Sequence, residues 1–175
     1  MRWRRGPTTL CPVRSLGSSL RDWRLPRLTI FVCSFCLPGA APRVKSEAGW
    51  SWVVLAAPPA AGPLRIVLEE GDSSGLAMGV ARLPQPAFKP IWGGDVWRLH
   101  ADDGFGFAVG EHLPPIEGWP CVRLGDTVAL ALRGGELTVR VNGGAEIRAA
   151  AGAGLADGGL RFFVEVFEGC VVRLE

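Results

Sequence analysis

The sequence has no apolar stretch long enough to cross a bilayer as a helix. Its longest mostly apolar run, residues 28–37, has ten residues, whereas a membrane-spanning helix needs ~20, so we expect no membrane span. The simplest interpretation of residues 1–41 is an unstructured tail. The run also has the length of a signal-peptide apolar core, and the Arg-rich, acid-poor residues before it suit an organellar transit peptide. A secreted or organellar location therefore stays open beside the intracellular, cytoplasmic one that we expect.

The sequence also lacks the cysteine and histidine spacing of a metal site. Its five cysteines are scattered and odd in number, which argues against a disulfide framework. Cys33 and Cys36 form a single pair, and zinc needs a second pair or two suitably spaced histidines. We expect no metal and no cofactor. Whether Cys121 pairs with Cys170 is not decided by the sequence.

Catalytic motifs are missing as well. The chain contains no Gly-x-Ser-x-Gly elbow and no phosphate-binding Walker loop. It has two histidines, His100 and His112, and no motif surrounds either of them. Neighbouring carboxylates such as Asp102 and Asp103 lie in turn-like sequence, where solvated surface charge is the ordinary interpretation. We expect no catalytic residue and no enzyme activity.

Charge is sparse, at 21% of residues, and unevenly placed. Residues 1–47 hold nine Lys and Arg against two carboxylates, a net charge of +7, and residues 48–175 hold ten against fifteen, a net charge of −5. We therefore divide the chain into a basic, Pro-containing tail or targeting segment with a linker (1–47) and one folded domain (48–175). An acidic domain does not present the basic stripe that nucleic-acid binding needs, so we expect no nucleic-acid partner.

Short apolar runs separated by turn residues fill the folded part. Alternation or continuous apolar character predicts strands at residues 50–57, 64–69, 76–82, 96–100, 105–109, 127–132, 137–141, 145–148, 160–166 and 170–174. Leu76, Met78 and Val80 should face inward, and Gly79 indicates a close backbone approach or a bulge. Residues 83–95, the stretch after residue 109 and the Ala/Gly run 149–159 are expected to be loops.

Two glycine-containing turns support this assignment. Gly134-Gly135 can supply the positive φ of a hairpin turn, and Asn142-Gly143 is a strong signal for a type I′ hairpin. With no helical period of useful length, the pattern predicts an all-β fold, a two-layer antiparallel β-sandwich or a barrel.

The order of several motifs resembles the SPRY family, a group of concanavalin-like β-sandwiches. Gly125-Asp126 precedes a hydrophobic strand, and Gly135-Glu-Leu-Thr-Val-Arg-Val-Asn142-Gly143 is similar to the family's Gly-x-Leu hairpin. Gly79-Val80 and Asp103-Gly104 are similar to its Gly-Val strand and Asp-Gly turn. Arg133 and Val139 stand where the family usually has an acidic and an aromatic residue, so the wider concanavalin-like group stays open. The resemblance covers about residues 50–175.

The resemblance implies a SPRY-like sandwich that binds a protein or peptide ligand through loops at one edge, as an adaptor or substrate-recognition domain. Aromatic and charged residues beside the expected loops are the candidate partner-binding positions: Trp92, Trp97, His100, Asp102, Asp103 and Trp119. Trp50 and Trp52 should lie in the core. A secreted concanavalin-like carbohydrate-binding domain is the main alternative, because loop aromatics also suit sugar stacking. A glycan-cleaving enzyme is a weaker one, and the oligomeric state is unknown.

Overall fold

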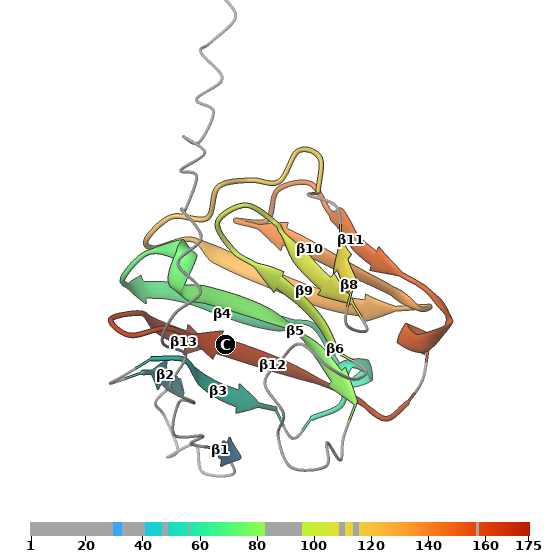
Figure 1. Ribbon diagram of the computed structural model, residues 1–175, viewed down its shortest axis with the longest axis horizontal. Helices are drawn as coiled ribbons and strands as arrows, with labels where there is room; N and C mark the ends of the chain where they lie inside the picture. Colours follow the sequence, from blue (N-terminus) through green and yellow to red (C-terminus); the bar gives the residue numbers. More distant parts are fainter. Residues whose placement is uncertain are drawn as a thin grey trace, which may run out of the picture.

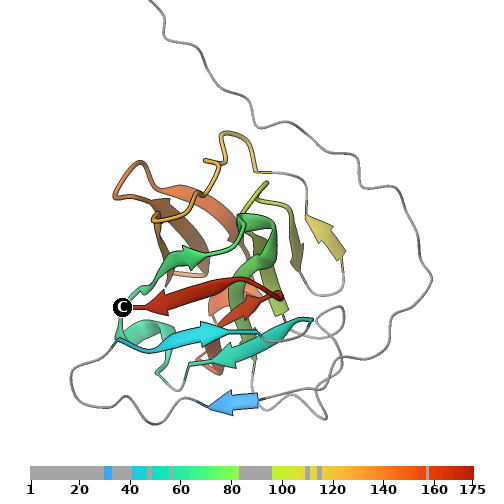
Figure 2. The same cartoon turned by 90° about the vertical axis from the view of Figure 1, so that its left-hand side faces the viewer.

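Two β-sheets pack face to face and form the body of the molecule (Figures 1 and 2). The computed structural model describes residues 30–32, 41–46, 49–55, 57–82, 96–108, 111–113, 116–156 and 158–175. Every strand pairing in it is antiparallel except that of β1 with β3. The expected two-layer antiparallel sandwich is confirmed.

Sheet A contains seven strands in the order β1-β3-β12-β5-β6-β7-β8. Figure 2 shows β1 at the outside of this sheet, beside β3. The bounds are β1 Ile30–Val32, β3 Ser51–Val54, β12 Leu160–Val166, β5 Leu76–Arg82, β6 Val96–His100, β7 Gly106–Ala108 and β8 Glu111–Leu113.

Sheet B contains six strands in the order β11-β10-β9-β4-β13-β2. Their bounds are β11 Ile147–Ala151, β10 Glu136–Val141, β9 Thr127–Arg133, β4 Leu64–Glu70, β13 Val171–Leu174 and β2 Arg43–Lys45. Three short 3-10 turns complete the described secondary structure, at Pro59–Ala61, Ser73–Gly75 and Ala153–Ala156.

The main core lies between the sheets and follows the period-2 alternation of the strands. Leu76, Met78 and Val80 of β5 face it and are completely buried, as expected. Gly79, between them, confirms the predicted close approach, because a Cβ there would lie 1.8 Å from the backbone oxygen of Trp97.

A second, smaller buried cluster lies on the outer face of sheet A. Trp52 and Val54 of β3, Ala81 of β5, Val96 of β6 and Phe163 of β12 form it. These residues have the opposite strand parity to those in the main core. Trp52 is therefore buried as expected, but outside the space between the sheets.

The turns follow the predicted chemistry closely. Gly134 and Gly135 both have positive φ between β9 and β10, and Asn142 (φ 50°) and Gly143 (φ 69°) both have positive φ after β10. Both hairpin-type turns are thus confirmed.

Four segments differ from expectation. Residues 30–32, assigned to the unstructured tail, form β1 and pair with β3. Residues 43–45, assigned to the linker, form β2 and pair with β13. The segment expected to be a loop after residue 109 contains β8, and β11 extends to Ala151 before the 3-10 turn at Ala153–Ala156.

Cys170 is a buried free thiol and Cys121 is disulfide-bonded, so these two cysteines do not pair with each other.

Candidate binding site at the end of sheet A

The tight turn between β6 and β7 carries two of the predicted site residues, Asp102 and Asp103. The Asp102 Oδ1 accepts a hydrogen bond from the Asp103 backbone N–H (2.9 Å), and the Asp103 Oδ1 accepts one from the Phe105 N–H (2.8 Å). Gly104, between Asp103 and Phe105, supplies a positive φ of 68°. The backbone therefore holds both carboxylates in place, with Asp103 exposed and Asp102 half-buried.

Trp119 packs over this turn from the segment before β9. Its Nε1 donates to the backbone oxygen of Ala101 at 3.0 Å. A Cβ on Gly104 would come within 2.5 Å of the indole ring. Trp119 is half-buried and packs against the main core. It supports the turn from one side and leaves only part of its surface for a partner.

Four rings line up beside the turn on the outer face of sheet A: Phe167, Trp50, His100 and Phe105. The centroids of Phe167 and Trp50 lie 5.1 Å apart, those of Trp50 and His100 6.4 Å, and those of His100 and Phe105 6.4 Å. Phe167, directly after β12, is 40% exposed. We call these four residues the ring row.

A buried ion pair lies next to the ring row. The Arg98 Nε donates to the Glu165 Oε2 at 2.6 Å, and both side chains are almost fully buried. Arg98 on β6 is level with Gly79 of β5, and Glu165 on β12 is level with Ala77 of β5. The small residues of β5 leave space for the guanidinium to reach across that strand.

Arg98 also joins the ion pair to the ring row. Its guanidinium carbon lies 5.4 Å from the centre of the Trp50 ring, a cation–π distance, and it contacts the His100 Nε2. Arg98 thus supports the ring row from the sheet side, and it cannot move without breaking its buried ion pair with Glu165.

Burial determines the protonation of this region. Burial, with the Arg98 charge adding to it, lowers the pKa of His100 to about 4, so the imidazole is neutral near pH 7. Burial raises the pKa of Glu165 to about 7 although Arg98 opposes the change. Burial and the adjacent Asp103 raise the pKa of Asp102. The outward-facing charge of the site is therefore negative and is centred on Asp103.

The structure brings together four of the six predicted residues: His100, Asp102, Asp103 and Trp119. Trp97 is different, because it is 6% exposed and belongs to the main core. It alternates with Arg98 on β6, so its ring points between the sheets and is not available at the surface. Trp92 lies outside the described residues.

Sequence reasoning missed Trp50, Phe105 and Phe167. Trp50 was expected in the core, but it is half-buried at the surface of the site. The missing signal was strand parity. Trp50 has the parity of Trp52, and Phe167 has that of Phe163 and Glu165, which lie on the outer face of sheet A. Phe105 joins them through its contact with His100 across the turn between β6 and β7.

The part of the chain that the structure describes has neither a metal-ligand cluster nor a membrane-spanning helix. No group of three or more His, Cys, Asp or Glu residues there is arranged to hold a metal ion. No helix within the same residues is long and apolar enough to cross a membrane.

Comparison with known proteins shows the fold. No family model matches the sequence, and no curated protein matches it. Among solved structures, the SPRY domain of human HERC1 superimposes with a TM-score of 0.52 at 18% identity, covering 77% of this chain and 78% of that one. A human SPRY domain gives a TM-score of 0.55 at 16% identity, covering 75% of this chain and 87% of that one. The chain therefore has a SPRY-like fold.

Proposed function

We propose that this protein is a non-enzymatic binding module that recognises a peptide or a surface epitope of another protein through the end of sheet A. The observation that carries the proposal is the ring row, which ends in the exposed Phe167 and lies beside the fixed carboxylates of Asp102 and Asp103. Aromatic side chains in a supported, partly exposed cluster are typical of the residues that dominate binding energy at protein interfaces. The SPRY-like fold agrees with such a role.

The chemistry of the site suggests its partner. Asp103 is exposed, and its carboxylate binds the backbone of Phe105, the first ring of the ring row. His100, Trp50 and Phe167 follow along the row at centroid spacings of 5.1–6.4 Å. A lysine or arginine side chain can pair with the carboxylate and lay its methylene groups on the rings. The partner is therefore expected to present a basic residue next to an apolar one.

The state of His100 supports binding over catalysis. A general base needs a pKa near the working pH, whereas the pKa of His100 is about 4 and its Nε2 contacts Arg98. The imidazole acts as a neutral link between Arg98 and the rings. Sugar stacking on the same rings is the alternative use of this surface, and protein capture compared with glycan binding separates the two.

The proposal includes an intracellular location. Disulfides are rare in the cytosol and persist in oxidising compartments, so the Cys121 disulfide of the structure counts against this part of the proposal, and the state of Cys121 in cells tests it directly. Alkylation of cell extracts without reductant should label Cys121 if the protein is cytoplasmic. Protection of Cys121 until a reductant is added would favour the secreted or organellar alternative.

The central test is affinity capture with the 175-residue chain as bait. Phe167→Ala should lower partner affinity about tenfold, because it removes an anchor worth more than ~1 kcal/mol, and Asp103→Asn should lower it several-fold and reduce its salt dependence. Leu124→Ala is the matched control, since Leu124 is 63% exposed and is not part of the ring row. Unchanged capture by Phe167→Ala would contradict the proposal. Phe167-dependent binding to a glycan array, without protein capture, would favour the carbohydrate alternative.

A further inference from the structure

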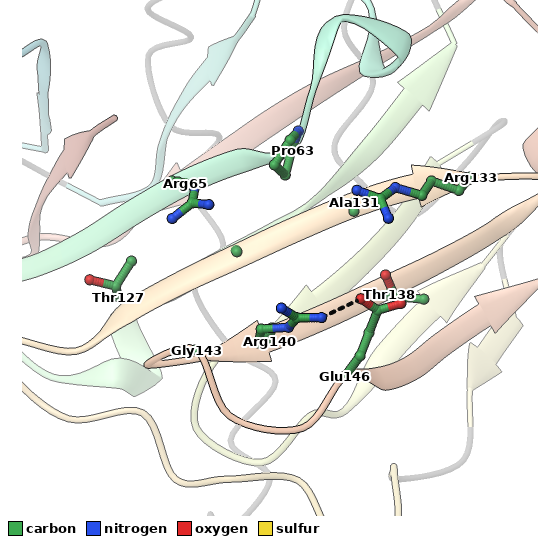
Figure 3. A pocket seen from close by; sticks show the side chains of 10 residues that line it. Pro63, Arg65, Thr127, Ala131, Arg133, Thr138, Arg140, Gly143 and Glu146 are labelled. Atoms are coloured by element: carbon green, nitrogen blue, oxygen red, sulfur yellow. Dashed lines mark hydrogen bonds and ion pairs between the residues drawn. The ribbon is translucent and has the colours of Figure 1, made fainter.

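A groove of about 230 Å³ lies on the outer face of sheet B, away from the ring row (Figure 3). Its floor is the outer face of β9, where three successive outward-facing side chains are small: Thr127, Ala129 and Ala131. Longer side chains from the neighbouring strands β4 and β10 form its walls. The groove therefore runs along β9.

Strand register places three arginines around this floor. Arg65 of β4 and Arg140 of β10 are both level with Ala129, one on each side of β9. Neighbouring strands lie ~4.8 Å apart, so the two backbones stand roughly 10 Å apart across the alanine. Arg133 ends β9 four residues further on, and its side chain runs back toward Ala131 (Figure 3).

Two of these arginines have no carboxylate partner among the described residues. Elsewhere on the outer face of sheet B, Arg43 and Arg173 pair with Glu69, and Arg148 pairs with Glu136. No such pair exists for Arg65 or Arg133 in the described part of the chain. Positive charge is therefore left uncompensated in the groove of a domain whose residues 48–175 carry a net charge of −5.

Glu146 shows what the groove accepts. Its carboxylate reaches the groove from the segment between β10 and β11 and accepts a hydrogen bond from the Arg140 Nη2 at 2.9 Å (Figure 3). Both side chains stay nearly half exposed. The carboxylate of Glu146 thus occupies part of the groove, while the guanidinium groups of Arg65 and Arg133 remain available to a ligand.

We propose that this groove is a second binding surface that takes an extended acidic peptide segment of another protein. The alanine floor gives room for a backbone along β9, and the arginines can pair with its carboxylates. Since an extended chain advances ~3.4 Å per residue, Arg65 and Arg133 are matched by acidic residues about four positions apart. This surface is separate from the ring row, so an experiment can contradict the proposal for one surface without affecting the proposal for the other.

Charge and size favour a peptide over other anionic ligands. Small-molecule sites usually measure ~300 Å³ or more and enclose their ligand, whereas this groove is smaller and open along the strand. Nucleic acid would need a longer run of basic residues, and the acidic balance of the domain opposes it. A second copy of this chain, offering the Asp102–Asp103 turn, is the other occupant that the test must separate.

Fluorescence anisotropy with two labelled probes tests the proposal on the full chain. One probe is an extended Gly/Ser peptide with two glutamates four positions apart, and the other is the same peptide with glutamine at both positions. We expect the glutamate probe to bind more tightly, Arg65→Ala and Arg133→Ala each to weaken it about fivefold or more, and Glu146→Gln to strengthen it. The matched control is the double variant Arg43→Ala/Arg123→Ala, which removes the same charge as Arg65→Ala/Arg133→Ala from positions that do not line the groove.

Several outcomes would overturn the proposal. Equal binding of the two probes would show that the carboxylates are not recognised, and equal weakening by the control double variant would show attraction to overall charge alone. Tighter binding of a single-stranded oligonucleotide that depends on Arg65 and Arg133 would assign the groove to nucleic acid. Self-association in analytical ultracentrifugation that disappears in Arg65→Ala/Arg133→Ala would assign it to a second copy.

Discussion

At the scale of single residues, Gly79 shows how strongly one backbone contact restricts the sequence. It lies in the middle of β5 with ordinary extended geometry, so its need for glycine comes from space alone: an added Cβ would lie 1.8 Å from the Trp97 oxygen. We expect Gly79→Ala to lower the free energy of unfolding by about 3 kcal/mol or more, as for severe overpacking.

Gly158→Ala is the matched control for this prediction, because a Cβ added at Gly158 would have nothing within 4 Å and the φ of Gly158 is not in the left-handed region. Urea denaturation should show Gly158→Ala as neutral or slightly stabilising. Equal midpoints for the two variants would show that the close approach at Gly79 does not restrict the residue there.

Two residues of the site should make stability depend on pH in opposite directions. The pKa of Glu165 is raised from 4.5 to about 7, so between these values the folded state binds more protons and stability falls as the pH rises. The pKa of His100 is lowered from 6.5 to about 4, so between those values the unfolded state binds more protons and stability rises with pH. In the shared window the two contributions offset each other.

Single variants should separate these contributions. His100→Asn keeps only the Glu165 effect, and its stability should fall relative to the wild type as the pH rises from about 4.5 to 6.5, by up to about 1.4 kcal/mol per pH unit. Glu165→Gln keeps only the His100 effect, and its stability should rise relative to the wild type over the same window. Urea titrations at several pH values measure both, and curves parallel to the wild type would show that neither group is shifted.

At the scale of elements, the turn after β10 joins two strands through one side chain. The Asn142 Nδ2 donates to the Asp126 Oδ1 at 2.6 Å, and its Oδ1 accepts from the Thr127 N–H at 2.9 Å. Its φ of 50° is the only positive value of a non-glycine residue among the described residues. Asn142 therefore ties the start of β9 to the end of β10.

Two variants separate the bonds of Asn142 from its backbone conformation. Asn142→Gly keeps the conformation and loses the bonds, and it should lower the free energy of unfolding by about 1 kcal/mol. Asn142→Ala loses both, and it should lower the free energy by about 2 kcal/mol because a left-handed residue with a Cβ costs roughly 1 kcal/mol more. Chemical denaturation measures the difference, and equal effects would mean that the positive φ carries no cost.

The strands that the sequence predicted best are those with their own alternation and turn residues. The bounds of β5, β6 and β12 agree with the predicted 76–82, 96–100 and 160–166. The strands β2 and β8 have only three residues each, too few for a period to be visible, and they form through pairing with β13 and β7. These two strands therefore depend on their pairing partners and not on a pattern of their own. The partner of β2 is distant in the sequence, and that of β8 is its neighbour in the sequence.

The site could be predicted only in part for a similar reason. Asp102 and Asp103 were found because a turn is local chemistry. Trp50 and Phe167 come together because β3 and β12 pair, a contact between positions more than a hundred residues apart. The arginine groove was invisible in the same way, since Arg65 and Arg140 meet only through the register of three strands.

At the scale of the whole molecule, β2 ties the N-terminal part of the sequence to the sandwich. Val44 is 5% exposed and belongs to the main core, and the Leu174 N–H donates to the Pro42 oxygen at 2.8 Å. The fragment 48–175 lacks these contacts and leaves β13 as an open edge of sheet B. We expect it to be less stable than the fragment 41–175 by about 2–4 kcal/mol, from one buried valine and the lost backbone bonds.

Point variants of the full chain show whether the loss comes from β2 itself. Val44→Ala should lower the free energy of unfolding by about 1.5 kcal/mol for two buried methyl groups, whereas Lys45→Ala, exposed on the same strand, should change it by no more than about 0.5 kcal/mol. The open edge in the fragment 48–175 should also make aggregation depend on protein concentration, which light scattering detects. If the fragment 48–175 matched 41–175 in both stability and solubility, this would show that β2 neither stabilises the sandwich nor protects the edge of sheet B.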